Sequence, residues 1–357
     1  MKRLPVFRLV IALSLLISAI GLAMPGLASA STAQTYTVLV GAENVALRTG
    51  VMAYFPATLH IHVGDTVIWK QNTHEIHTVT FLAGAAMPQT LVPTPSGFTP
   101  AGLMLNPQVA FPAMPQDGMY DGSTYANSGV MSIDPGQPTQ FNLTFTKQGS
   151  FPYVCVIHGM MMSGTVVVEA SSVSIPSPAV VSIQAQAAMS AQLANSYALY
   201  GAALGKVPAP KKNPDGSTNY TVLIGWSQGQ YDLMDFIPNN LAVHQGDTVT
   251  FALSPTNTEA PHTVTFLNGA DDISFITPIP NPPGPPVLLI NPQVLAPINP
   301  GQPLTRSGIY SSGLLNPLGP GPYEYTVTIG DISGNILYVC ILHDTSGMEA
   351  ILQVVPK

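Results

Sequence analysis

Two Cys-x2-His motifs hold the residues of this 357-residue chain that are best suited to chemistry. In the second motif, Cys340 and His343 are followed by Met348, and His262 opens an apolar stretch far upstream. One thiolate and two imidazoles in a plane, with a weak thioether contact on the axis, form a mononuclear type 1 (blue) copper site. The spacing allows one loop to supply three ligands while a neighbouring strand supplies His262. We therefore predict a copper site made of these four residues.

The first motif has the same residue types in a shorter loop. His77, Cys155 and His158 occupy the matching places, but three successive methionines follow, at positions 160 to 162. A buried cysteine is often only a small apolar residue, and a single strand histidine is more often structural than a ligand. Because the whole set occurs twice in one chain, we predict a copper site here as well.

The two motifs belong to a sequence repeat. Residues 36–41 (YTVLVG) recur as residues 220–225 (YTVLIG), and residues 77–81 (HTVTF) recur unchanged as residues 262–266. Self-similarity of this kind indicates a duplicated domain. Shorter matches keep the same order: 64–67 with 246–249, 106–109 with 291–294, and 153–155 with 338–340.

Each copy has the periodicity of short strands. Apolar residues alternate with histidines around residues 59–63, and Gly or Pro residues interrupt the chain throughout. We therefore expect an antiparallel β-sandwich of about seven or eight strands in each copy. The expected domains are 31–170 and 219–357, joined by a Ser/Pro- and Ala-rich linker, 171–218, that could form a helix. Long Pro/Gly-rich segments near 82–140 and 267–322 are expected to be functional covers or contact surfaces.

The ligand loops, with their upstream His strands, resemble the plastocyanin-like cupredoxins over about 36–170 and 220–356. The resemblance implies an all-β fold of two tandem Greek-key β-sandwich domains, each with one redox-active copper ion. In this family the ligand Met is commonly followed by x-Gly-x-Val-x-Val, and residues 162–168 (MSGTVVV) fit that pattern. The resemblance thus favours Met162 as the axial ligand of the first site, with Met161 as the alternate and Met160 as the least suited.

The same resemblance implies a route for electrons. In the family, the His of the Cys-x2-His loop reaches the surface and serves as the electron port, which here gives His158 and His343. Many relatives have Asn directly after the first ligand His, where it ties down the loop around the thiolate. Thr78 and Thr263 stand there in this chain. This departure puts the surroundings of the thiolate, and hence the redox potential, in question.

The pattern favours an electron-transfer protein over an enzyme. Copper nitrite reductases and small laccases, which this chain resembles in architecture, add a catalytic copper held by further histidines beside the ligand Cys and five residues after the first ligand His. Aliphatic residues occupy those places here, including Val154, Leu82, Val339 and Leu267. A copper-handling protein for storage, delivery or tolerance is the alternative, because methionines are abundant in the first copy and thioethers select Cu(I). A copper oxidoreductase of the nitrite reductase or laccase type is the third hypothesis.

Residues 1–30 have the features of an export signal: a basic start, an uncharged apolar run over 9–24, and small residues at 28–30. The protein is therefore expected to be periplasmic or extracellular, with an uncleaved N-terminal membrane anchor as the alternative. The net charge of -7 disfavours nucleic acid as a partner, so redox proteins are the expected partners, and the sequence leaves the oligomeric state open. Cys155 and Cys340 each lie in their own ligand loop, which argues against a disulfide between them.

Overall fold

The computed structural model describes residues 32–257, 260–317, 319 and 321–356. The predicted export signal lies outside these residues. The described residues from Ala33 onward group into one compact unit. Within the described part of the chain, no helix is long and apolar enough to cross a membrane.

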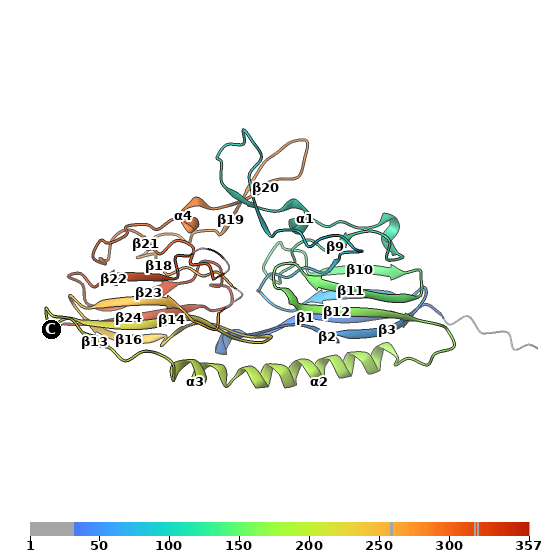
Figure 1. Ribbon diagram of the computed structural model, residues 1–357, viewed down its shortest axis with the longest axis horizontal. Helices are drawn as coiled ribbons and strands as arrows, with labels where there is room; N and C mark the ends of the chain where they lie inside the picture. The colour runs from blue at the N-terminus through green and yellow to red at the C-terminus, as the bar shows by residue number, and fades with distance from the viewer. Residues whose placement is uncertain (1–31, 258–259, 318, 320, 357) are drawn as a thin grey trace, which may run out of the picture. The chain divides into compact units, whose positions relative to one another are not determined.

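The first half of this unit is a sandwich of two sheets (Figure 1). Large aromatic residues fill the space between them: the ring of Trp69 lies 5.5 Å from that of Phe81 and 5.3 Å from that of Tyr153. Alternate residues of a strand point to opposite faces, so Val67 and Trp69 both face this core. One sheet contains β2 (Thr49–Phe55), β1 (Thr35–Asn44), β4 (Thr66–Gln71), β10 (Gln140–Phe145) and β8 (Met119–Tyr120); the other contains β3 (Thr58–His62), β12 (Gly159–Glu169), β11 (Gly149–Cys155), β5 (Thr80–Phe81) and β9 (Ala126–Asn127).

The second half repeats the arrangement with its own core. Phe251 and Phe266 each lie 5.2 Å from the ring of Tyr338. One group of strands contains β22 (Glu324–Thr328), β17 (Thr248–Leu253), β14 (Thr218–Gln228), β15 (Tyr231–Ile237) and the short β13 (Lys211–Lys212); the facing sheet contains β16 (Asn240–His244), β24 (Glu349–Val355), β23 (Gly334–Val339), β18 (Thr265–Phe266) and β21 (Tyr310–Ser311).

The sandwiches are all-β, as predicted, but the expectation of purely antiparallel sheets is wrong. In the first half β1 pairs with β4, and β3 with β12, in parallel. In the second half β14 pairs with β17, and β16 with β24, in the same way. The cause is the crossover: β3 lies in the opposite sheet, so the chain returns to the first sheet at β4 running in the direction of β1. Alternation alone does not reveal which strands are neighbours.

Among the described residues, two strand pairings join the halves. Strand β2 pairs antiparallel with β15, with Gly50 opposite Asp232, so one sheet continues from one sandwich into the other. The two long Pro/Gly-rich segments also meet, because β7 (Leu103–Leu105) pairs with β20 (Val287–Ile290). These segments carry β6 (Leu91–Pro93), β19 (Ile276–Ile279), α1 (Pro107–Ala110) and α4 (Pro292–Leu295), and part of each forms the contact surface that was expected (Figure 1).

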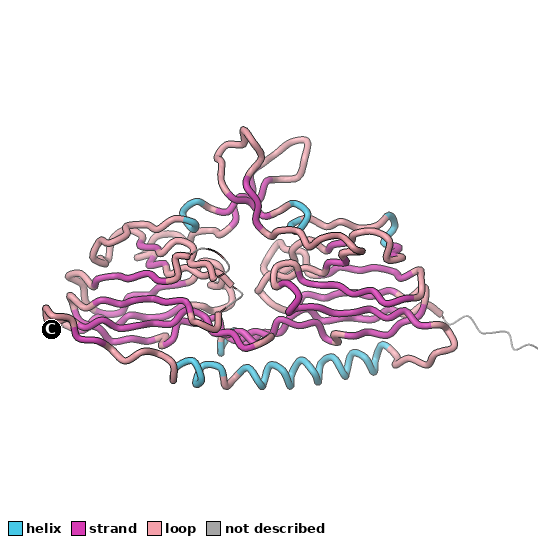
Figure 2. Tube along the Cα trace, in the orientation of Figure 1, coloured by secondary structure: helices cyan, strands magenta, loops and turns pink. Residues whose placement is uncertain are grey.

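The Ala-rich linker is helical, as the sequence suggested (Figure 2). Helix α2 (Pro178–Ser196) starts at Ser177, whose hydroxyl accepts a hydrogen bond from the backbone of Val180, and a Pro at the first position suits a helix start. Ala185 of α2 is buried against residues of β1 and β2, whereas α3 (Leu199–Leu204) buries Leu199 against β14 and β15. The linker therefore contacts both sandwiches.

Candidate metal centres

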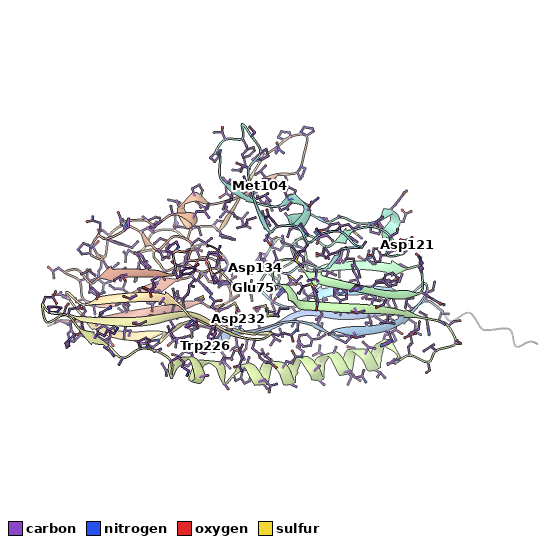
Figure 3. All side chains as sticks on the ribbon, in the orientation of Figure 1. Glu75, Met104, Asp121, Asp134, Trp226 and Asp232 are labelled. Carbon is purple, nitrogen blue, oxygen red and sulfur yellow. The ribbon has the colours of Figure 1, made fainter. Side chains whose placement is uncertain are left out.

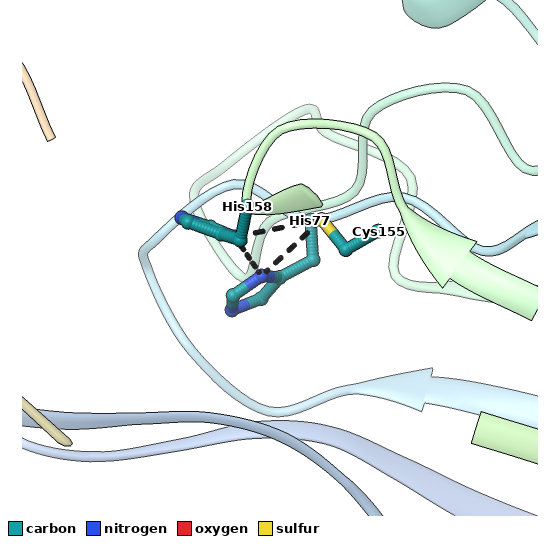
Figure 4. Close-up of side chains that lie close together, drawn as sticks. All are labelled: His77, Cys155 and His158. Atoms are coloured by element: carbon teal, nitrogen blue, oxygen red, sulfur yellow. Dashed lines mark hydrogen bonds between the residues drawn. The ribbon is translucent and has the colours of Figure 1, made fainter. Parts of the chain in front are cut away.

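The first centre gathers three donors from well-separated parts of the sequence (Figure 4). His77 precedes β5 and is fixed by two backbone hydrogen bonds with Met131. Cys155 ends β11, and His158 lies in the turn that leads to β12. The Cys155 sulfur lies 3.4 Å from Nδ1 of His158 and 3.9 Å from Nδ1 of His77, and the two Nδ1 atoms are 3.1 Å apart.

The second centre has the same geometry. The Cys340 sulfur lies 3.4 Å from Nδ1 of His343 and 3.7 Å from Nδ1 of His262. The two Nδ1 atoms are again 3.1 Å apart. Backbone hydrogen bonds from Cys340 to Met348 and from Met348 to His343 close the loop that connects β23 with β24.

Both triangles have the size that one metal ion requires. Metal–nitrogen bonds of about 2.0 Å and a metal–sulfur bond of about 2.3 Å, spread trigonally, place donors roughly 3.5 to 3.7 Å apart. The observed separations, 3.1 to 3.9 Å in the first centre, bracket that value. Two imidazoles and one thiolate match the donor set of type 1 copper. The residues therefore fit the ion that the sequence motif suggested.

The methionines differ sharply in their surroundings. Met162 is fully buried in the same core cluster as Cys155, and Met348 is fully buried in the cluster of Cys340. Met161 is only partly buried beside the first cluster, and Met160 is 71% exposed. This burial is consistent with Met162 and Met348 as the axial ligands.

A glycine makes room for the strand histidine in each half. Gly41 has a φ of 69°, and a Cβ atom there would lie 2.7 Å from Nε2 of His77. Gly225 has a φ of 63°, and its Cβ would lie 2.6 Å from Nε2 of His262. Both glycines sit at register shifts, in β1 and β14 respectively. These positions close the repeated YTVL[VI]G segments, so the repeat contained this signal, although its function could not be read without the fold.

The threonines after the strand histidines hold the ligand loops. The backbone N–H of Thr78 donates to the Cys155 sulfur at 3.3 Å, and the hydroxyl of Thr78 accepts from the backbone N–H of Val156 at 2.9 Å. Thr263 makes the same two contacts, with Cys340 at 3.4 Å and Ile341 at 2.9 Å. A loop tie is therefore present although Asn is replaced by Thr.

Electrostatics favour a thiolate at both cysteines. Burial would raise the pKa of Cys155, but the charge and hydrogen bonds of His158 and His77 hold it well below its usual value. The same balance, with His343 as the largest favourable influence, lowers the pKa of Cys340. The thiolate is the form that binds a metal ion. Each cysteine is thus prepared for coordination by its neighbouring imidazoles.

The two loop histidines do not lie at the surface, so this part of the port expectation is wrong. The side chains of His158 and His343 are each 4% exposed. Both face Glu75: Nε2 of His158 lies 3.6 Å from Oε1, and Nε2 of His343 lies 3.6 Å from Oε2. Where the two halves meet, both ligand loops face Glu75. A single carboxylate therefore contacts the loop histidine of each centre.

Sequence reasoning missed Glu75. Burial would raise its pKa, but His343, His158 and His77 lower it to about 2. Cys155 and Glu75 together raise the pKa of His158 to about 10, although burial acts in the opposite direction. A signal was available in the repeat: the matching position of the second half holds Ala260. An acidic residue two positions before a ligand, present in one copy only, marks a role that the copies do not share.

Each half also donates a hydrogen bond to the ligand loop of the other half. Arg48, which follows the turn after β1, donates from Nε to the backbone oxygen of Gly347 at 2.6 Å. Gln230, in the equivalent turn before β15, donates to the backbone oxygen of Met161 at 3.0 Å. Gly347 and Met161 each precede a candidate axial methionine. Nothing in the sequence of either half shows this exchange, because it depends on how the halves pair.

A cavity of about 850 Å³ lies against both loop histidines. Its lining includes Glu75 and Asp134, both labelled in Figure 3, as well as Asp344 beside His343. Burial and a hydrogen bond with Asp272 raise the pKa of Asp344 to about 7. The cavity is therefore acidic in character but mostly apolar in its walls.

The four remaining histidines have other partners. His60 contacts Glu169 at 2.8 Å, and His74 contacts Glu43 at 2.5 Å. His62 bonds to the backbone oxygen of Val173, and His244 lies 3.6 Å from Asp247. Of these four, His74 lines the cavity.

A family model and several solved structures match part of this chain. Residues 42–169 match the family model of the copper binding proteins of the plastocyanin/azurin family. An oxidised methionine-to-lysine variant of amicyanin is 24% identical over 38% of this chain and 82% of its own, with a TM-score of 0.23. The Cu(I) form of a methionine-to-alanine variant is 25% identical over 40% and 89%, with a TM-score of 0.23. The segment matched by the family model contains all four predicted ligands of the first centre.

Proposed function

Since the chain is a cupredoxin-like protein, we propose that it is an electron-transfer protein holding one type 1 copper ion in each half. The observation that carries the proposal is the pair of matching donor triangles, His77–Cys155–His158 and His262–Cys340–His343. The first triangle lies in the segment that matches the copper-binding family. The second has the same donors at nearly the same separations.

The protein's part in this function is to keep the donors in place. A bound copper ion would supply a one-electron change between Cu(I) and Cu(II). Backbone pairing at Met131, the room left by Gly41 and the loop tie at Thr78 fix the first set of donors. Burial of Cys155 excludes water from the thiolate. A rigid, dry site of this kind needs little rearrangement when an electron arrives or leaves.

The positions of the methionines favour an electron-transfer role over a role in copper storage or delivery. Met104 and Met131 of the first half are 7% and 1% exposed and belong to the packed interior. Met114, Met119 and Met160 are about half exposed or more, and they come from different elements. A store for Cu(I) would group its thioethers around an ion. Met104 and Met131 instead fill space in the interior, a common use of methionine.

The proposal includes the setting of the protein. The export features of residues 1–30 support a periplasmic or extracellular carrier that exchanges electrons with redox proteins. We propose a non-enzymatic role because the positions where copper oxidoreductases carry further histidines are aliphatic, as at Val154 and Val339.

The test is removal of each thiolate in turn. Thiolate ligation gives oxidised type 1 copper its intense blue colour, so Cys155→Ser and Cys340→Ser should each remove about half of the absorption and one copper ion per chain. The double variant should be colourless. A single variant that removes all the colour, or none, would contradict two independent sites.

A further inference from the structure

The loop histidines of both centres, His158 and His343, contact the same carboxylate, that of Glu75. We propose that Glu75 couples the two copper sites, so that His158 and His343 form the two ends of one internal contact instead of two separate docking ports. This inference rests on the proposed function, because it concerns the copper ions that the two donor sets would hold.

The orientation of the rings carries the proposal. In each loop histidine, Nδ1 faces the donor triangle and Nε2 faces Glu75. The two carboxylate oxygens are divided between the rings: Oε1 lies 3.6 Å from His158 and Oε2 lies 3.6 Å from His343. An imidazole whose Nδ1 holds a metal ion carries its remaining proton on Nε2 and can direct it to a carboxylate. One side chain can therefore act on both ligands.

The surroundings keep Glu75 in this place. Its backbone oxygen accepts hydrogen bonds from the side chains of Gln71, at 2.7 Å, and Thr73, at 3.0 Å. Its side chain is 11% exposed. Two strand pairings, β2 with β15 and β7 with β20, hold the two halves together. The contact therefore lies between two halves that these strand pairings connect.

The two halves differ at the position of Glu75, which is consistent with one residue that serves both sites. Ala260 stands in the second half where Glu75 stands in the first, and both line the same cavity. A second carboxylate here would add a like charge to the wall of the same cavity, and two like charges repel. One Glu and one Ala place a carboxylate at one of the two matching positions and not at the other.

A shared negative charge has a definite consequence for both sites. The oxidised ion carries one more positive charge than the reduced ion, so a nearby carboxylate stabilises the oxidised state. Glu75 should therefore lower the reduction potential in both halves, although it belongs to the sequence of the first half only.

The experiment uses chains with one copper site each. Glu75→Gln is introduced into the Cys340→Ser variant, which keeps the first site, and into the Cys155→Ser variant, which keeps the second site. Reduction potentials are measured by spectroelectrochemistry. Asp134→Asn is the matched control, since it removes one carboxylate charge from the wall of the same cavity without contact with a loop histidine. Glu75→Asp keeps the charge, and circular dichroism reports folding.

We expect Glu75→Gln to raise the potential at both sites by clearly more than Asp134→Asn does, and Glu75→Asp to restore part of the difference. A rise at the first site alone, or a shift no larger than that of the control, would overturn the coupling. If the parent single-site variants show no type 1 spectrum, the proposed function itself fails. That failure is recognised before Glu75 is changed.

Discussion

Arg48 donates a hydrogen bond of 2.6 Å to the backbone oxygen of Gly347, the residue before Met348, across the joint between the two halves. Gln230 does the same for Met161, the residue before Met162, in the opposite direction. The two contacts come from equivalent turns and reach equivalent places. Each half therefore helps to hold the loop that carries the axial methionine of the other.

This exchange predicts effects that cross between the halves. Gln230→Met should disturb the spectrum of the first copper site, and Arg48→Met that of the second, because each removes the tie on the opposite loop. Loss of one part-buried hydrogen bond should also lower the free energy of unfolding by about 1 kcal/mol. Electron paramagnetic resonance spectra of the single-site variants test the predicted change at each copper site. Changes confined to the half that carries the substitution would contradict the exchange.

A second prediction concerns the glycine that faces the strand histidine. Gly41→Ala should abolish or strongly weaken copper binding at the first site only, since its Cβ would lie 2.7 Å from Nε2 of His77. Gly64 also has a positive φ, 94°, but nothing lies within 4 Å of its Cβ position. Gly64→Ala therefore serves as the control: it carries the backbone strain of roughly 1 kcal/mol and should still bind two copper ions. Equal copper loss in both variants would show that strain, not space, matters.

The loop tie at Thr78 can be tested by a change of similar shape. Thr78→Val leaves the Val156 N–H without its acceptor, which should lower stability by about 1 to 3 kcal/mol and broaden the signal of the first copper site. Thr78→Ser keeps the hydroxyl and should behave nearly like the parent chain. Urea unfolding measures the change in stability, and electron paramagnetic resonance spectra measure the change at the copper site. If Thr78→Val and Thr78→Ser are indistinguishable, the hydroxyl does not hold the loop.

A pH effect is expected from Asp235. Burial raises its pKa to about 6, although Arg48 pulls it downward. A carboxyl group with a pKa above its unfolded value of 3.8 stabilises the fold in its neutral form. Its contribution is fully present below pH 3.8 and is lost as the pH rises through about 6. The loss should not exceed about 3 kcal/mol, at about 1.4 kcal/mol per pKa unit.

Asp235→Asn should remove this loss. The unfolding free energy of the metal-free variant should then change less between pH 4 and pH 7 than that of the parent chain. Glu324→Gln, which changes an exposed residue of β22, should leave the pH profile as it is. Parallel profiles for Asp235→Asn and the parent chain would show that Asp235 does not cause the dependence.

The sequence was a good guide to the donors and a poor guide to their surroundings. His77 and Cys155 could be found because a metal site restricts residue type and spacing within one domain, and the repeat showed the pattern twice. Glu75, Arg48 and Gln230 act across the joint, and a contact between domains leaves no periodicity in either one. The direction of the loop histidines was missed for the same reason, since both rings face Glu75 where the two halves meet.

The measurement that tests the central claim most directly is a copper count combined with optical and paramagnetic resonance spectra of the full chain. We predict two copper ions per chain, an intense blue oxidised form, and the narrow copper hyperfine splitting of type 1 sites from both ions. One tightly bound copper ion, a colourless copper-loaded protein, or a signal from an ion without thiolate ligation would contradict the account.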